Sequence, residues 1–154
     1  MMVVGEINLK QENIFKLIHA IQQINNENII KFTKAFPYPL GISPILVLSE
    51  LKNKGPQRQV DLAETIGYTK GAMTNIATKL LNLGLVEKLS NEKDRRSIEL
   101  KITPAGEKAL TEAQAIGQKL FVEIFEVLDE EEIKQYLLIQ EKLLENVKGQ
   151  ARRN

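Results

Sequence analysis

Hydroxyl, amide and ammonium side chains are concentrated between residues 69 and 79, at spacings that place them on one side of a helix. They lie opposite an apolar stripe that would face a core. The polar set is Thr69, Lys70, Thr74, Asn75, Thr78 and Lys79, and the apolar set is Met73, Ile76, Ala77 and Leu80. Such polar groups contact the base edges and phosphates of nucleic acid. An ordinary amphipathic surface helix has the same pattern, so the neighbouring elements must decide between the two interpretations.

A second group of functional side chains, Asp94, Arg95 and Arg96, lies in a polar run from residue 91 to residue 96. The run separates residues 85–90 from residues 98–102, where apolar and polar residues alternate as in a half-buried strand. It therefore predicts the tip of a hairpin. There the carboxylate can pair with one guanidinium group while the other points outward, which suits the narrow, negatively charged minor groove of DNA. In isolation, a solvated charged turn is an equally good interpretation.

Caps and helix breakers predict three short helices that position these two segments. Ser43 followed by Pro44 predicts the start of the first helix, which ends at Gly55. The second is short and ends at Gly67, and Thr69 caps the third after a tight turn. The apolar face expected for the second helix is Val60, Leu62, Ala63 and Ile66.

The third helix has a well-defined end. With Gly84 in the left-handed conformation, Leu85 can fold back against Leu80. Three short helices followed by a two-stranded hairpin form the winged variant of helix-turn-helix, in which the polar helix fits the major groove. We therefore expect a mainly α (α+β) protein with a winged helix-turn-helix lobe over residues 43–103.

Long amphipathic helices are predicted on both sides of this lobe, over residues 8–36 and 104–148. Thr103 with Pro104 predicts the start of the C-terminal segment, and Asp129 with Glu132 forms a capping box that divides it. The last helix should end near Lys148. The apolar stripes of these helices exceed what the small lobe can cover, so we expect a homodimer. The flanking helices would then be the dimerisation region of a single domain spanning residues 1–154.

Charge is distributed unevenly, although the whole chain carries a formal charge of only +1. Residues 52–101 hold ten Lys or Arg against six Asp or Glu, which concentrates positive charge in the predicted lobe. Binding to DNA phosphates releases counterions, so we expect affinity to fall steeply with salt.

Composition argues against most enzyme and metal chemistry. There is no Cys and only one His, His19, which lies off the apolar stripe of its helix. We expect no catalytic residue, no metal and no cofactor, because we also find no catalytic sequence motif. No segment is long and apolar enough to span a membrane, and the N-terminus lacks the basic start of a secretory signal, so we expect a cytoplasmic protein.

Two stretches resemble the MarR (multiple antibiotic resistance regulator) family. They are VDLAETIGYTKGAMTNIATKL from Val60, similar to the helix pair of the family, and LLNLGLVEKLSNEKDRRSIELKITPAGEKAL from Leu80, similar to its wing and the following helix. The resemblance implies a homodimeric transcription regulator, usually a repressor, that leaves DNA when a small molecule binds between arm and lobe. It also implies major-groove contacts from residues 69–79 and a wing contact from Asp94 and Arg96.

The sequence departs from the family pattern at two points. Lys88 stands where the family often has Arg, and Asn75 where it often has a basic residue, so the base preference of the family is not carried over. Family members that sense oxidants use a Cys, which is absent here. We therefore expect a regulator that binds a pseudo-palindromic operator in double-stranded DNA. The alternative is a winged helix that has lost DNA binding and contacts a protein.

Overall fold

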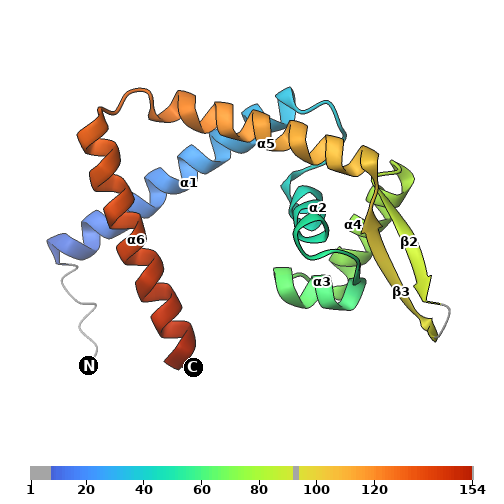
Figure 1. Ribbon diagram of the computed structural model, residues 1–154. Helices are drawn as coiled ribbons and strands as arrows, with labels where there is room; N and C mark the ends of the chain where they lie inside the picture. Colours follow the sequence, from blue (N-terminus) through green and yellow to red (C-terminus); the bar gives the residue numbers. More distant parts are fainter. Residues whose placement is uncertain (1–7, 92–93, 154) are drawn as a thin grey trace. The chain divides into compact units, whose positions relative to one another are not determined.

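The computed structural model describes residues 8–91 and 94–153, while the side chains of residues 91 and 94–96 lie outside that description. The elements follow one another as α1 (Leu9–Ala35), α2 (Ile42–Lys54), β1 (Gln57–Arg58), α3 (Gln59–Ile66), α4 (Lys70–Asn82), β2 (Val86–Asn91), β3 (Asp94–Ile102), α5 (Pro104–Phe125) and α6 (Glu130–Arg153) (Figure 1). The chain forms two compact units, Met1–Gly117 and Gln118–Asn154, which we describe separately.

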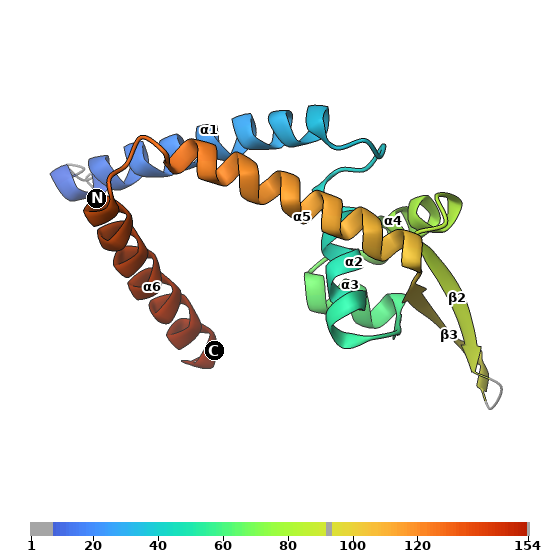
Figure 2. The same ribbon diagram turned by 45° about the horizontal axis from the view of Figure 1, so that its top comes forward.

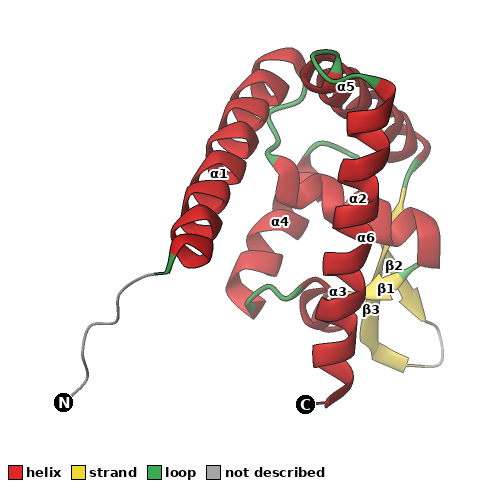
Figure 3. Cartoon of the chain, turned by 90° about the vertical axis from the view of Figure 1, so that its left-hand side faces the viewer, coloured by secondary structure: helices red, strands yellow, loops and turns green. Residues whose placement is uncertain are grey.

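The strands form one antiparallel sheet with the order β1-β3-β2, and all other described elements are helical (Figure 3). β2 and β3 pair along the hairpin, with Val86 opposite Ile102 and Lys88 opposite Leu100. The sequence predicted this hairpin. It did not predict β1, whose two residues Gln57 and Arg58 add a third strand beside β3.

Almost every element of the lobe contributes at least one leucine to the core of the first unit. The fully buried side chains are Val47, Leu48, Leu51, Leu62, Met73, Leu80, Leu85, Leu100 and Leu110. Leu110 shows that the first half of α5 belongs to this core, together with Ala109 and Ala113. No polar or charged residue is buried among the described residues. The lobe is therefore held together by apolar packing, the dominant favourable contribution to folding.

The end of α4 has the geometry that the sequence predicted. Gly84 has φ 70°, its N–H donates to the Leu81 carbonyl at 3.1 Å, and the Leu85 N–H donates to the Leu80 carbonyl at 3.0 Å. These two bonds satisfy carbonyls that would otherwise end the helix unpaired. Leu80 and Leu85 are both buried. The turn therefore fixes where β2 leaves α4.

The start of α5 packs directly on that turn. The Thr103 hydroxyl accepts from the Gly106 N–H at 3.1 Å, as expected for a cap, and donates to the Gly84 carbonyl at 2.7 Å. A Cβ atom on Gly106 would lie 2.0 Å from the Leu85 carbonyl oxygen. The absence of a side chain at position 106 therefore allows α5 to approach the α4–β2 turn.

Two predicted helix ends were wrong. α2 begins at Ile42, with Gly41 at the N-cap and no side-chain cap, so Ser43 lies inside the helix. Its hydroxyl instead accepts a hydrogen bond from the Tyr68 hydroxyl at 3.0 Å. α6 continues to Arg153 rather than ending near Lys148. Arg152 and Arg153 favour this extension because basic side chains stabilise the negative end of the helix dipole.

The helices α1 and α6 bury little of their apolar surface within one chain. α1 begins at the Asn8 cap and has one buried residue, Phe32, whose ring stacks on Phe36 with centroids 5.1 Å apart. α6 begins with the predicted capping box, in which the Asp129 carboxylate accepts from the Glu132 N–H at 2.8 Å, and it has no buried residue.

Candidate DNA-binding interface

A tight turn joins α3 to α4 and sets the direction of α4. Gly67 adopts the left-handed conformation with φ 83°, and the N–H groups of Gly67 and Tyr68 both donate to the Ala63 carbonyl at 2.9 Å. Thr69 then caps α4, its hydroxyl accepting from the Ala72 N–H at 3.1 Å. Both the left-handed glycine and the cap were predicted from the sequence. Together they form the helix-turn-helix that holds α4 against α3.

α4 presents to solvent the polar face that the sequence predicted. The residues predicted to contact DNA from this helix are all exposed, namely Thr69, Lys70, Thr74, Asn75, Thr78 and Lys79. The opposite stripe is buried in the lobe and comprises Met73, Ile76, Ala77 and Leu80. The fold thus brings six of the nine predicted site residues onto one exposed surface.

Two threonines on that surface each donate a hydrogen bond within the helix. The Thr74 hydroxyl donates to the Lys70 carbonyl, and the Thr78 hydroxyl donates to the Thr74 carbonyl, each at 2.9 Å. A hydroxyl has one proton to donate. Because that proton is used within the helix, each hydroxyl can offer only its lone pairs to a ligand.

The β2–β3 hairpin extends away from α2, α3 and α4, as Figure 2 shows. Asp94 begins β3 and pairs with Asn91 across the hairpin, and Arg95 and Arg96 follow in the same strand. The predicted hairpin is therefore confirmed, but the predicted tip is too long: these three residues lie in β3 rather than in the turn, because the pairing of the two strands continues to Asn91 and Asp94. The predicted pairing of the Asp94 carboxylate with an arginine lies outside the described residues.

An apolar groove between α3 and α4 was missed by sequence reasoning. Val60, in the first turn of α3, was predicted in the core but is 58% exposed. The groove has a volume of about 110 Å³ and is lined by Gln59, Val60, Ala63, Lys70, Met73 and Thr74. It therefore shares Lys70 and Thr74 with the polar face of α4.

Arg58 was also missed as a residue of this region. Its guanidinium group forms a two-pronged ion pair with Asp61, with distances of 2.9 Å from Nε to Oδ2 and 3.2 Å from Nη2 to Oδ1. The pair spans the start of α3, where a carboxylate favours the positive end of the helix. Arg58 is therefore held beside the helix-turn-helix.

The described residues contain no group of three or more His, Cys, Asp or Glu side chains that could hold a metal ion. In the same part of the chain, none of the helices combines the length and apolar character needed to cross a membrane.

The lobe defines the chain as a winged helix-turn-helix protein, and known proteins of this class match it. Residues 42–98 match the sequence model of the MarR family. The HTH-type transcriptional repressor MdtR of Bacillus subtilis (strain 168) is 29% identical over 116 residues, which cover 74% of this chain and 75% of MdtR. Over its winged helix-turn-helix lobe, the chain is therefore similar to the MarR family.

Solved structures have the same fold over most of their length. The crystal structure of YusO from Bacillus subtilis is 27% identical and superposes with a TM-score of 0.73, covering 92% of this chain and 98% of YusO. A mutant MarR from E. coli, complexed with operator DNA, is 23% identical and superposes with a TM-score of 0.68, covering 91% of this chain and 99% of that one.

Proposed function

We propose that this protein is a transcription regulator that binds a pseudo-palindromic operator in double-stranded DNA, and that it acts as a homodimeric repressor. The observation that carries the proposal is the exposed polar face of α4, which the Thr69 cap and the turn at Gly67 hold outward from a closed apolar core. This is the arrangement that places a recognition helix in the major groove. The match of residues 42–98 to the MarR family model and the likeness to the repressor MdtR support it.

The proposed contacts divide between two grooves. α4 would contact base edges and phosphates of the major groove through Thr69, Lys70, Thr74, Asn75, Thr78 and Lys79. The hairpin would reach the adjacent minor groove with Asp94, Arg95 and Arg96. Positive charge supports this division, because residues 52–101 carry the excess of Lys and Arg.

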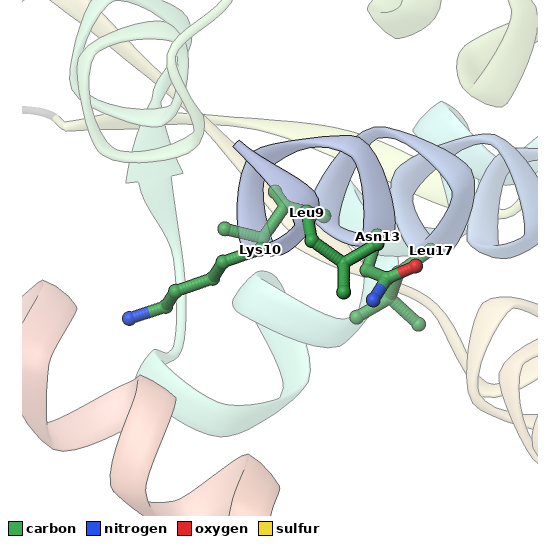
Figure 4. Close-up of a pocket in the computed structure, with 5 residues that line it drawn as sticks. Leu9, Lys10, Asn13 and Leu17 are labelled. Carbon is green, nitrogen blue, oxygen red and sulfur yellow. The ribbon is translucent and has the colours of Figure 1, made fainter. Parts of the chain in front are cut away.

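Unpartnered apolar side chains support the homodimer. On the first turns of α1, Leu9 and Leu17 extend from the helix beside Lys10 and Asn13, with Leu9 74% exposed (Figure 4). The same is true along the second unit, where the exposed residues of α6 include Leu137, Leu138, Ile139, Leu143, Leu144 and Val147. A second copy of the chain would bury such surfaces from water. The two-fold symmetry of that dimer predicts DNA half-sites roughly 34–36 Å apart.

The residues 8–36 and 104–148 would then form the dimerisation region, and residues 43–103 the DNA-binding lobe of one domain. The likeness of residues 42–98 to the MarR family further supports a small-molecule effector that relieves DNA binding, and a protein that works in the cytoplasm, where its DNA is.

The experiment is a selection of bound genomic fragments followed by a binding titration against salt. A DNA binder should lose affinity linearly on a logarithmic salt scale, with a slope of about −0.9 per neutralised phosphate. Arg96→Ala should weaken binding, and Arg152→Ala, the same change at the end of α6, should not. Retained affinity at high salt and in Arg96→Ala would contradict the proposal and favour a winged helix that contacts a protein.

A further inference from the structure

We propose that Thr74 recognises a thymine methyl group, so that the centre of the α4 face selects A·T base pairs. This inference rests on the proposed function and goes beyond it, because it names the base class and the atom that is recognised.

The first step is the hydrogen bond inside α4. The Thr74 hydroxyl donates its proton to the Lys70 carbonyl at 2.9 Å. The hydroxyl and the γ-methyl group branch from the same carbon, and the bond holds one staggered arrangement of the side chain. The methyl group is therefore the part of Thr74 that is not tied to the backbone, and it has a fixed direction.

The second step is the groove beside it. Thr74 forms part of the wall of the groove between α3 and α4, together with the apolar side chains of Val60, Ala63 and Met73. Among the edges that base pairs present in the major groove, the C5-methyl of thymine is the apolar group. A thymine methyl that entered this groove would contact the Thr74 methyl and the exposed Val60 side chain.

The third step is charge at the rim of the groove. Lys70 lines the same groove, and its ammonium group is suited to a phosphate of the DNA backbone. This favours DNA over an uncharged apolar ligand as the occupant. A nucleotide offers the methyl group and the phosphate together.

The fourth step is the chemistry that α4 lacks. Residues 70–82 contain no Arg, so this helix cannot make the bidentate arginine contact that most often selects guanine. Next to Thr74 stands Asn75, which is exposed and has the amide group that pairs with adenine N6 and N7. Both central side chains therefore favour the two bases of an A·T pair.

The test uses an operator obtained by selection, with each thymine of a half-site replaced in turn by deoxyuridine, which lacks only the C5-methyl. We expect one or two positions per half-site where replacement weakens binding about fourfold, and about 15-fold when both half-sites are changed. Thr74→Ser removes the methyl and keeps the hydroxyl, so it should discriminate clearly less between the thymine and deoxyuridine operators than the unchanged protein does. Thr74→Val keeps a methyl and should retain the discrimination.

The matched control is Thr111→Ser in α5, the same change at an exposed threonine outside the DNA-binding face, whose hydroxyl also donates to the carbonyl four residues earlier, that of Glu107, at 3.0 Å. It should leave the thymine preference at those positions unchanged, and thermal unfolding should show all three variants folded. If the protein binds the operator with the expected salt dependence but no thymine replacement weakens it, the inference is overturned and the proposed function stands. If Thr74→Ser keeps the full discrimination or Thr111→Ser removes it, the assignment to Thr74 is overturned. If no selected duplex binds, the proposed function fails and this inference with it.

Discussion

The winged-helix lobe and α6 differ in how they use their leucines. In the lobe, Leu48, Leu62 and Leu80 are fully buried within a single chain. In α6, Leu137 is 55% exposed and Leu144 is 53% exposed, and no residue of the helix is buried. The lobe therefore completes its core within one chain, whereas α6 leaves its leucines exposed, although both regions have similar apolar patterns in the sequence. Under the proposed homodimer, a second copy would cover the leucines of α6.

The largest effect is expected in the lobe. Leu80→Ala removes a fully buried side chain that packs beneath the α4–β2 turn, so it should lower the free energy of unfolding by about 2–5 kcal/mol. Urea unfolding followed by circular dichroism measures this. The control is Leu83→Ala near the same helix end, where the side chain is 38% exposed and the loss should be below about 1 kcal/mol. Equal losses in the two variants would remove the distinction between core and surface at this end of α4.

In α6 the corresponding change should act on assembly. The double variant Leu137→Glu, Leu144→Glu places two charges on the exposed apolar face, and we expect the dimer to weaken by a factor of about 100 or more, roughly 2.7 kcal/mol. Sedimentation equilibrium measures the dissociation constant. Lys142→Glu puts a charge of the same sign elsewhere on the helix and should leave the dimer intact. A double variant that stays dimeric would show that this face of α6 has no partner.

A smaller effect is expected at the cap of α4. Thr69→Ala removes the acceptor for the Ala72 N–H, which should cost about 1 kcal/mol of stability. Thr69→Ser keeps the acceptor and should restore it. Thermal unfolding of the two variants tests the cap, and identical melting temperatures would contradict the role of this hydroxyl.

The smallest effect has the opposite sign. A Cβ atom on Gly71 would meet nothing within 4 Å, so Gly71→Ala should stabilise the chain by about 0.5–1 kcal/mol through the higher helix propensity of alanine. Thermal unfolding measures the gain. A less stable variant would contradict this expectation and show that a side chain at position 71 meets a steric obstacle that is absent from the single chain.

Local rules predicted the parts of the fold whose partners are close in sequence. Thr69 and Ala72, Gly84 and Leu81, and the Asp129–Glu132 box each lie within three residues of one another, so the residue types alone identify them. The exposed face of α4 followed from the same reasoning, because helical spacing separates its polar and apolar residues.

Features that depend on distant partners could not be predicted. A two-residue strand such as β1 has no periodicity, and its partner β3 lies some 40 residues further along the chain. The Ser43 hydroxyl finds Tyr68 rather than its own helix end. The groove beside Thr74 exists only because α3 and α4 pack together, so Val60 alone gave no indication of it.

The junction of Gly84, Leu85 and Thr103 has a mechanical consequence. The last turn of α4, the base of the wing and the first turn of α5 are fastened at one point by the Thr103 hydroxyl and by the Thr103 N–H, which donates to the Leu85 carbonyl at 3.1 Å. Gly106 packs so closely against the same carbonyl that no side chain would fit between α5 and the α4–β2 turn. A displacement of the start of α5 would therefore move α4 and the β2–β3 hairpin together.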